Sequence, residues 1–307
     1  MRRLHCPTCA NEVFFDSLAC VHCGTSLVMA VGDGLRVTDA ATGVPCVRRD
    51  EWACNWTAAG SGAPLCHSCV LVDAGGHQHD PLMATFQSAQ RRALYQLGVL
   101  GVPWMVGVRF IYRSTAAGHD AVIGHESGVI TLDLDEADPA RREHIQASLG
   151  EHYRTPLGHI RHELGHFVWA ALVATDQTRL DEFRALFGDE QADYVEALDA
   201  HYGRADDGSW CDTHASFYAT AHPWEDFAES WAQLMHVHDV VETGAEWGVV
   251  RAPEPGDAAA WLTTSITAGV AANELARAMG MRDPYPFALA PGARAKVEFC
   301  WRLLPAR

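Results

Sequence analysis

The chain lacks the features of an exported or membrane-bound protein. It begins Met-Arg-Arg-Leu-His-Cys, without the apolar core of a signal peptide. It also has no run of about eighteen apolar residues that could cross a bilayer. Disulfides are therefore not the expected role of its cysteines, because they form in oxidising compartments. The sequence predicts a cytoplasmic protein with no membrane partner.

Basic residues are also scarce. Lys and Arg number 23 against 39 Asp and Glu, which gives a formal charge of -16. Zinc modules that grip phosphates usually present a basic surface, so this balance argues against nucleic acid as a partner. It is compatible with a polypeptide substrate. The 307 residues, 48% of them hydrophobic, suffice for one sizeable domain plus small modules, and no repeat or low-complexity tract interrupts them.

Cysteine is nearly absent beyond residue 70, where only Cys211 and Cys300 occur. The other cysteines form two sets. The first has two C-x-x-C knuckles, the spacing of a structural zinc ribbon. The second has one C-x-x-C and two uneven gaps, and it predicts a further structural zinc site in which His67 could replace one ligand. The two sets are Cys6, Cys9, Cys20 and Cys23, and then Cys46, Cys54, Cys66 and Cys69.

A different metal signal lies at residues 162–166, which read His-Glu-Leu-Gly-His. Apolar residues recur at helical spacing from about 156 to 174, so His162 and His166 share one face of a helix and can reach one metal ion. Glu163 then faces the metal-activated water as a general base. The alternative is a purely structural helix, but buried imidazole and carboxylate groups are costly unless they are paired or metal-bound.

The third ligand of this site is predicted from the segment 223–230. No histidine follows His166 at the distance used by some zinc proteases. Glu225 and Glu229 lie four residues apart on a helix that starts at Pro223. We assign Glu225 to the metal and Glu229 to a hydrogen bond that orients a ligating imidazole. The alternative is an exposed acidic face at the start of this helix.

Several motifs together resemble one family, the bacterial zinc-ribbon putative zinc-binding metallopeptidases, and the ligand order resembles the gluzincins. The resemblance covers nearly the whole chain and implies the fold and a protease chemistry. The expected cofactors are one catalytic zinc ion and one or two structural zinc ions. The motifs are the two cysteine sets, Cys54-Asn-Trp56, Tyr153-Arg-Thr155, Gly158–His166, His222–Glu229 and Asp283–Phe287. The family does not supply a substrate.

The gluzincin resemblance also implies a hydroxyl donor for the oxyanion of the tetrahedral intermediate. Tyr218 stands in about the right place before Glu225 and is the candidate. His214 and His222 flank the same stretch and are alternatives, as is a packing role for all three. His159, one turn before His162, is expected to be a neighbour rather than a fourth ligand, because a catalytic zinc keeps one position open.

These patterns predict an α+β protein, in which N-terminal zinc ribbons precede a mainly helical zincin-like domain with a small sheet. The expected boundaries are a zinc ribbon at 1–31, a second cysteine-rich module at 32–75 and the metallopeptidase domain at 76–307. Residues 73–80 read as a linker with solvated histidines. Strands are expected at 104–112 and 128–134, the latter as an edge strand for an extended substrate. The expected helices cover residues 81–100, 138–153, 156–174, 178–187, 189–203, 223–242, 257–281 and 292–304.

The predicted function is hydrolysis of peptide bonds by a zinc-activated water, with Glu163 as general base and a polypeptide of unknown identity as substrate. Two other classes stay open. One is a catalytically idle module that recruits a protein partner through its zinc ribbons. The other is a zinc-ribbon regulator that binds nucleic acid. The ribbons could also cover the cleft as an inhibitory lid, in which case removing residues 1–75 raises activity.

Overall fold

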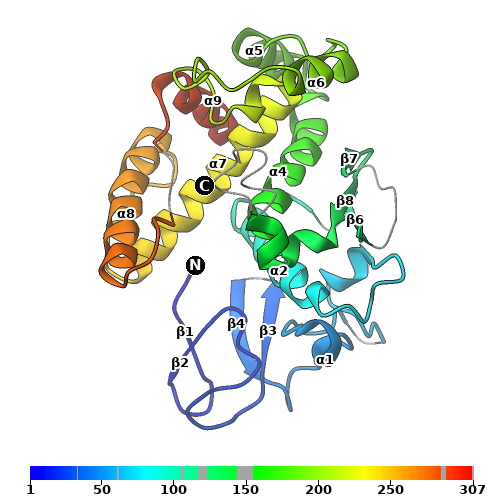
Figure 1. Cartoon of the computed structure of the whole chain (residues 1–307). Helices are drawn as coiled ribbons and strands as arrows, with labels where there is room; N and C mark the ends of the chain where they lie inside the picture. Colours follow the sequence, from blue (N-terminus) through cyan, green and yellow to red (C-terminus); the bar gives the residue numbers. More distant parts are fainter. Residues whose placement is uncertain are drawn as a thin grey trace. The chain divides into compact units, whose positions relative to one another are not determined.

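The computed structural model describes residues 1–32, 34–60, 62–104, 107–116, 123–143, 155–284 and 288–305. It is an α+β structure in which cysteine clusters that fit zinc ribbons precede a helical domain (Figure 1). The chain forms two compact units, Met1–Ile160 and Arg161–Arg307. Every described strand lies in the first unit, and the candidate metal ligands His162, His166 and Glu225 lie in the second.

The first unit begins with two small antiparallel pairs. Strand β1 (Leu4–His5) pairs with β2 (Glu12–Val13), and β3 (Leu27–Gly32) pairs with β4 (Gly34–Asp39), so the second hairpin crosses residue 31. The first described helix is α1 (Arg49–Trp52).

Hydrogen bonds join the two cysteine modules to each other. The Arg49 guanidinium donates to the carbonyl oxygens of Leu27 and Leu18 at 2.9 and 2.6 Å. The buried Asn55 side chain donates to the carbonyl oxygen of Phe15 at 2.5 Å. Since buried polar groups are costly without partners, these contacts fix the second module on the first.

A four-stranded sheet completes the first unit, in the order β5-β6-β8-β7. The pairs β5–β6 and β6–β8 are parallel, while β7–β8 is antiparallel. Strand β8 therefore lies inside the sheet, and the prediction of an edge strand at 128–134 is wrong. The strands are β5 (Val72–Asp73), β6 (Arg109–Arg113), β7 (Gly124–Glu126) and β8 (Val129–Asp133).

Helix α2 (Leu82–Val99) packs against this sheet. Alternate residues of β6 are buried, and Tyr112 contacts Phe86 of α2 with ring centroids 5.4 Å apart. The Tyr112 hydroxyl donates to Gln90, which in turn donates to the Ser68 carbonyl oxygen. This buried chain of hydrogen bonds connects the sheet and α2 to the second cysteine module.

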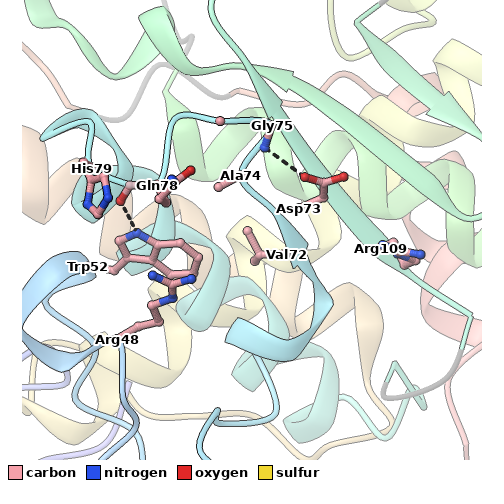
Figure 2. Close-up of a pocket in the computed structure, with 10 residues that line it drawn as sticks. Arg48, Trp52, Val72, Asp73, Ala74, Gly75, Gln78, His79 and Arg109 are labelled. Atoms are coloured by element: carbon pink, nitrogen blue, oxygen red, sulfur yellow. Dashed lines mark hydrogen bonds between the residues drawn. The ribbon is translucent and has the colours of Figure 1, made fainter.

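The segment 73–80 is not a free linker. Its first residue belongs to β5, and the Gly75 N–H donates to the Asp73 carboxylate at 2.9 Å. The buried Trp52 indole donates to the Gln78 carbonyl oxygen at 2.8 Å (Figure 2). His79 contacts Glu51 of α1. The segment that suggested a loose connection is therefore a turn anchored on α1, while the His79 side chain is 80% exposed, as expected of a solvated histidine.

A cavity of about 490 Å³ opens beside this turn, on the first unit. Arg48 lies over the Trp52 ring, 4.6 Å from its centroid, and Arg109 stands on the far side of Asp73 (Figure 2). The cavity contains none of the predicted metal ligands.

The second unit is built around α7 (Pro223–Glu246). Phe227 of α7 lies in a cluster of aromatic rings, with centroids 5.7 Å from Phe187 and 6.3 Å from Phe299. Lys296 also reaches α7, where its Nζ lies 2.5 Å from the buried Asp226 carboxylate. The other helices here are α5 (Gln177–Phe187), α6 (Tyr194–Tyr202), α8 (Ala258–Ala278) and α9 (Pro291–Arg302).

Most predicted helices are present, with local differences at their ends. Helix α4 (Pro156–Val168) continues into a π-helical turn, Trp169–Val173. Helix α6 begins five residues later than expected, at Tyr194, because the Asp193 side chain caps it. The expected helix at 138–153 is described only to residue 143. Its remainder, with the Tyr153-Arg154 part of one motif and residues 285–287 of another, lies outside the described residues.

None of the helices in the described ranges is both long and apolar enough to cross a membrane.

Candidate metal centre

Two imidazoles on α4 form the first half of the site. His162 and His166 lie one turn apart, with ring centroids 5.1 Å apart. Gly165, between them, faces α7 so closely that a Cβ at this position would lie 2.7 Å from the Ala228 Cα atom. The glycine thus permits a close approach of the two helices, which brings the α7 carboxylates to the imidazoles.

Glu225 supplies the third side chain. One of its carboxylate oxygens, Oε2, lies 3.0 Å from His162 Nε2, and the other, Oε1, lies 3.5 Å from His166 Nε2. Glu225 and the neighbouring Asp226 are each only 1% exposed, so the alternative of an exposed acidic helix face is wrong.

The three side chains fit a zinc ion. Their donor atoms all lie within 4.8 Å of one another, close to the spacing expected around one small ion. Two neutral imidazoles and one carboxylate are a donor set of catalytic zinc sites, which keep a fourth position open. A buried carboxylate that faces two imidazoles also offers the negative charge that a dication needs. The residues present are therefore suited to hold zinc.

Glu229 contacts the other side of His162. Its Oε1 lies 2.7 Å from His162 Nδ1, and its Oε2 accepts a hydrogen bond of 2.8 Å from the Ser216 hydroxyl. A carboxylate at Nδ1 keeps the proton on that nitrogen and leaves Nε2 to face the metal position. The structure therefore brings Glu229 into the orienting contact expected from its spacing.

The carboxylates change the protonation of His162. Burial alone would lower the pKa of His162, but hydrogen bonds and charges from Glu225 and Glu229 hold that pKa well above its usual value. Burial also disfavours ionised Glu225, yet His162 and His166 hold the pKa of Glu225 well below its usual range. In the metal-free protein, a proton on His162 thus supplies part of the positive charge that the carboxylates attract.

Two tyrosines stand beside this group. The Tyr218 ring lies 5.9 Å from the His162 ring, between centroids. The Tyr194 hydroxyl donates to Glu225 Oε1 at 2.7 Å. Burial, followed by the charge of Glu225, raises the pKa of both phenols, and the charge of Glu163 acts in the same direction. Glu163, itself 4% exposed, is therefore within electrostatic reach of both hydroxyls.

Tyr194 is absent from the sequence prediction. It lies 31 residues before Glu225 and belongs to no recognisable motif. Only its place at the start of a capped helix could be read locally, and this says nothing about where the ring points.

The other histidines make different contacts. His222 caps α7: its Nδ1 accepts from the Trp224 N–H at 3.2 Å, and its Nε2 donates to the Ala192 carbonyl oxygen at 3.2 Å. Both ring nitrogens of His222 are therefore occupied by backbone groups. His214 lies between Thr213 and Asp226.

His159, in the first unit, pairs with Glu136 at 2.8 Å. It is not part of the group of donor atoms formed by His162, His166 and Glu225.

Both cysteine sets converge in the first unit. Sulfur atoms lie 3.7 Å apart in the pairs Cys6–Cys23 and Cys9–Cys20, and 3.6 Å apart in Cys54–Cys66. Four sulfurs at about 2.3 Å from a tetrahedral zinc ion would stand roughly 3.8 Å apart, whereas a disulfide needs about 2.0 Å. The cysteines form no disulfides, and in each set the four sulfur atoms all lie within 4.8 Å of one another. His67 is not part of the second set, so four cysteines suffice there.

Comparisons with known proteins agree with this chemistry. A family model described as a putative zinc-binding metallo-peptidase matches residues 80–303. Uncharacterized proteins of Mycobacterium bovis and of two strains of Mycobacterium tuberculosis are each 35% identical over 325 aligned positions, which cover 97% of this chain and 94% of the relative. No solved structure matches the chain at a significant level.

Proposed function

Since this chain belongs to the family of putative zinc-binding metallopeptidases, we propose that its second unit hydrolyses peptide bonds with one zinc ion held by His162, His166 and Glu225. The observation that carries the proposal is the meeting of these donor atoms next to Glu163, the residue between the two imidazoles on α4. Zinc bound there would supply Lewis acidity, which lowers the pKa of a water molecule and polarises a peptide carbonyl group.

Glu163 is the proposed general base. It takes a proton from the attacking water and passes it to the leaving amine. Glu163 follows His162 directly on α4, and its carboxylate is buried. A base in this position can serve both proton transfers without moving between separate sites.

The remaining residues hold and polarise the reacting groups. Glu229, itself bonded to Ser216, keeps the His162 ring in the orientation that turns Nε2 toward Glu225. Tyr218 is the proposed donor to the oxyanion, where a hydrogen bond strengthens as negative charge develops. The two cysteine sets are proposed to hold structural zinc.

The test uses a library of peptides from a digested bacterial proteome, with new chain ends read by mass spectrometry. The full-length protein purified with zinc should generate new ends, and Glu163→Gln should reduce their rate of formation at least about 100-fold, as expected for loss of a general base. Glu163→Gln should keep the zinc of the His162 site. No cleavage by either protein would favour the catalytically idle recruitment module, and equal cleavage by both would contradict the role of Glu163.

A further inference from the structure

Tyr194 makes the shortest contact of Glu225. The phenol donates to Oε1 at 2.7 Å, while Oε2 lies 3.0 Å from His162. Glu225 is 1% exposed, so bulk water cannot replace the hydroxyl. A carboxylate that is fixed through one oxygen keeps the orientation of the other, and partners of this kind tune how well a side chain binds a metal.

The Tyr194 ring is itself held in place. It packs edge-on against His222 with centroids 5.2 Å apart and lies 6.1 Å from Trp224. His222 also donates to the Ala192 carbonyl oxygen, two residues before Tyr194, and caps α7 three residues before Glu225. One histidine therefore ties together the two chain segments that carry the hydroxyl and the carboxylate.

The hydroxyls of Tyr194 and Tyr218 differ in their contacts with Glu225. A phenol has one proton to donate. Tyr194 gives its proton to Glu225 Oε1. Tyr218 instead faces His162 through its ring, without a hydrogen bond to Glu225 among the described contacts. The Tyr218 hydroxyl is therefore not tied to the carboxylate that would hold the metal.

We propose that Tyr194 is a positioning residue that holds Glu225 through Oε1 and so fixes the other oxygen, Oε2, for metal binding, and that this leaves Tyr218 as the hydroxyl for the substrate. The inference rests on the proposed zinc site. It assigns to Tyr194 a role in metal affinity that does not require turnover, so its failure can be told apart from failure of the peptidase activity.

The experiment measures zinc affinity at the His162 site by competition with a chelator, on the full chain. Tyr194→Phe, which keeps the ring and removes the hydroxyl, should weaken zinc binding about 10-fold or more. The exposed Tyr202→Phe is the matched control, and its dissociation constant should stay within about twofold of the wild type. Tyr218→Phe should lose less affinity than Tyr194→Phe, because Tyr218 makes no hydrogen bond to Glu225 among the described contacts. The zinc of the cysteine sites should remain in all three variants.

A second measurement separates positioning from a general structural effect. In a Glu225→Ala background, Tyr194→Phe should cause no further loss of affinity, because the hydroxyl acts through that carboxylate. The inference would be overturned if Tyr194→Phe left the zinc affinity unchanged, or if Tyr194→Phe and Tyr218→Phe lost it equally. It would also be overturned if the loss persisted in the Glu225→Ala background, or if the cysteine-bound zinc were lost as well. Weakened zinc binding by Tyr194→Phe in a protein that cleaves no peptide would retain the inference and reject the peptidase.

Discussion

Gly165 lies directly against the backbone of Ala228. A Cβ at position 165 would stand 2.7 Å from the Ala228 Cα and 3.1 Å from its carbonyl oxygen. Real side-chain carbons do not come this close to backbone atoms, so the two helices pass at a distance that only glycine allows. The H-E-L-G-H segment thus carries both the ligands and the residue that admits the helix of the third ligand.

Gly165→Ala should therefore destabilise the protein, even though alanine favours helix by about 1 kcal/mol over glycine. The added methyl forces α4 and α7 apart, and overpacking of this kind costs about 1–3 kcal/mol. Thermal unfolding and zinc content should show a lower Tm and weaker metal binding. Gly256→Ala is the control, because a Cβ at that position meets no atom within 4 Å. A Gly165→Ala variant that is more stable than the wild type would contradict this packing.

Glu229 should control zinc affinity without binding the metal itself. Glu229→Ala removes the carboxylate 2.7 Å from His162 Nδ1, so the ring loses its orienting partner. Removal of such a partner typically weakens metal binding 10- to 100-fold. Ser216→Ala, which removes only the donor to the far oxygen of Glu229, should have a smaller effect in the same chelator competition. The reverse order of the two effects would show that Glu229 does not orient the ligand.

Zinc binding at the His162 site should release a proton near pH 7. The folded, metal-free protein holds the pKa of His162 well above its ordinary value of 6.5, so this imidazole is charged there at neutral pH, and zinc needs it neutral. Calorimetric heats of binding should therefore depend on the ionisation enthalpy of the buffer. Zinc affinity should rise with pH until the pH exceeds the raised pKa of His162.

The same shift fixes the sign of a stability effect. Because the folded pKa of His162 is raised, its pairing stabilises the metal-free protein fully below the unfolded pKa, and this contribution is lost as pH rises through the folded pKa. Glu229→Gln removes one of the carboxylates that raise this pKa. The pH at which the stabilisation is lost, and the pH at which zinc affinity stops rising, should therefore both be lower in this variant. Heats of zinc binding that are identical in all buffers would show that His162 is not protonated in the metal-free protein.

Helical periodicity was sufficient to predict α4 and α7, since each has an apolar face long enough to read. The spacing of His162, His166, Glu225 and Glu229 then predicts which side chains can share a face, and the structure brings all four together. Spacing along a helix is local information. The angle and distance between two helices are not, and these depend here on Gly165 and Ala228.

The other differences have similar physical causes. The glycines at 75 and 76 suggest a linker, but a turn that is fixed by a distant Trp52 has the same composition. The alternation of apolar and polar residues at 129–133 predicts a strand, but it does not predict which strands pair with it. The position of β8 inside the sheet could therefore not be predicted from the sequence. Tyr194 reaches Glu225 from another helix, and only the tertiary fold reveals that contact.

The full chain should carry about three zinc ions, one for each group of converging donors. His162→Ala should lose one of them and keep a folded N-terminal region, because its site lies in the second unit. Cys54→Ser should lose one and unfold its module, since small metal-bound modules depend on the ion for folding. Elemental analysis with thermal unfolding gives both quantities. Two or fewer ions in the wild type, unchanged by His162→Ala, would reject the metallopeptidase site.

Removal of residues 1–75 should destabilise the first unit, whether or not the zinc ribbons inhibit the enzyme. The deletion takes away β5, the strand paired with β6, and removes Phe15 from its contact with Tyr95 at 5.5 Å. It also removes the Ser68 carbonyl oxygen that accepts from the buried Gln90.

A buried donor left without its partner costs about 1–3 kcal/mol, and exposed apolar surface adds to this. The fragment 76–307 should therefore unfold at lower temperature and aggregate, so a change in its activity cannot by itself report an inhibitory lid. Size-exclusion chromatography and thermal unfolding check this. A monomeric fragment with the Tm of the full chain would show that the metallopeptidase region folds without the cysteine modules, and the lid could then be tested by deletion.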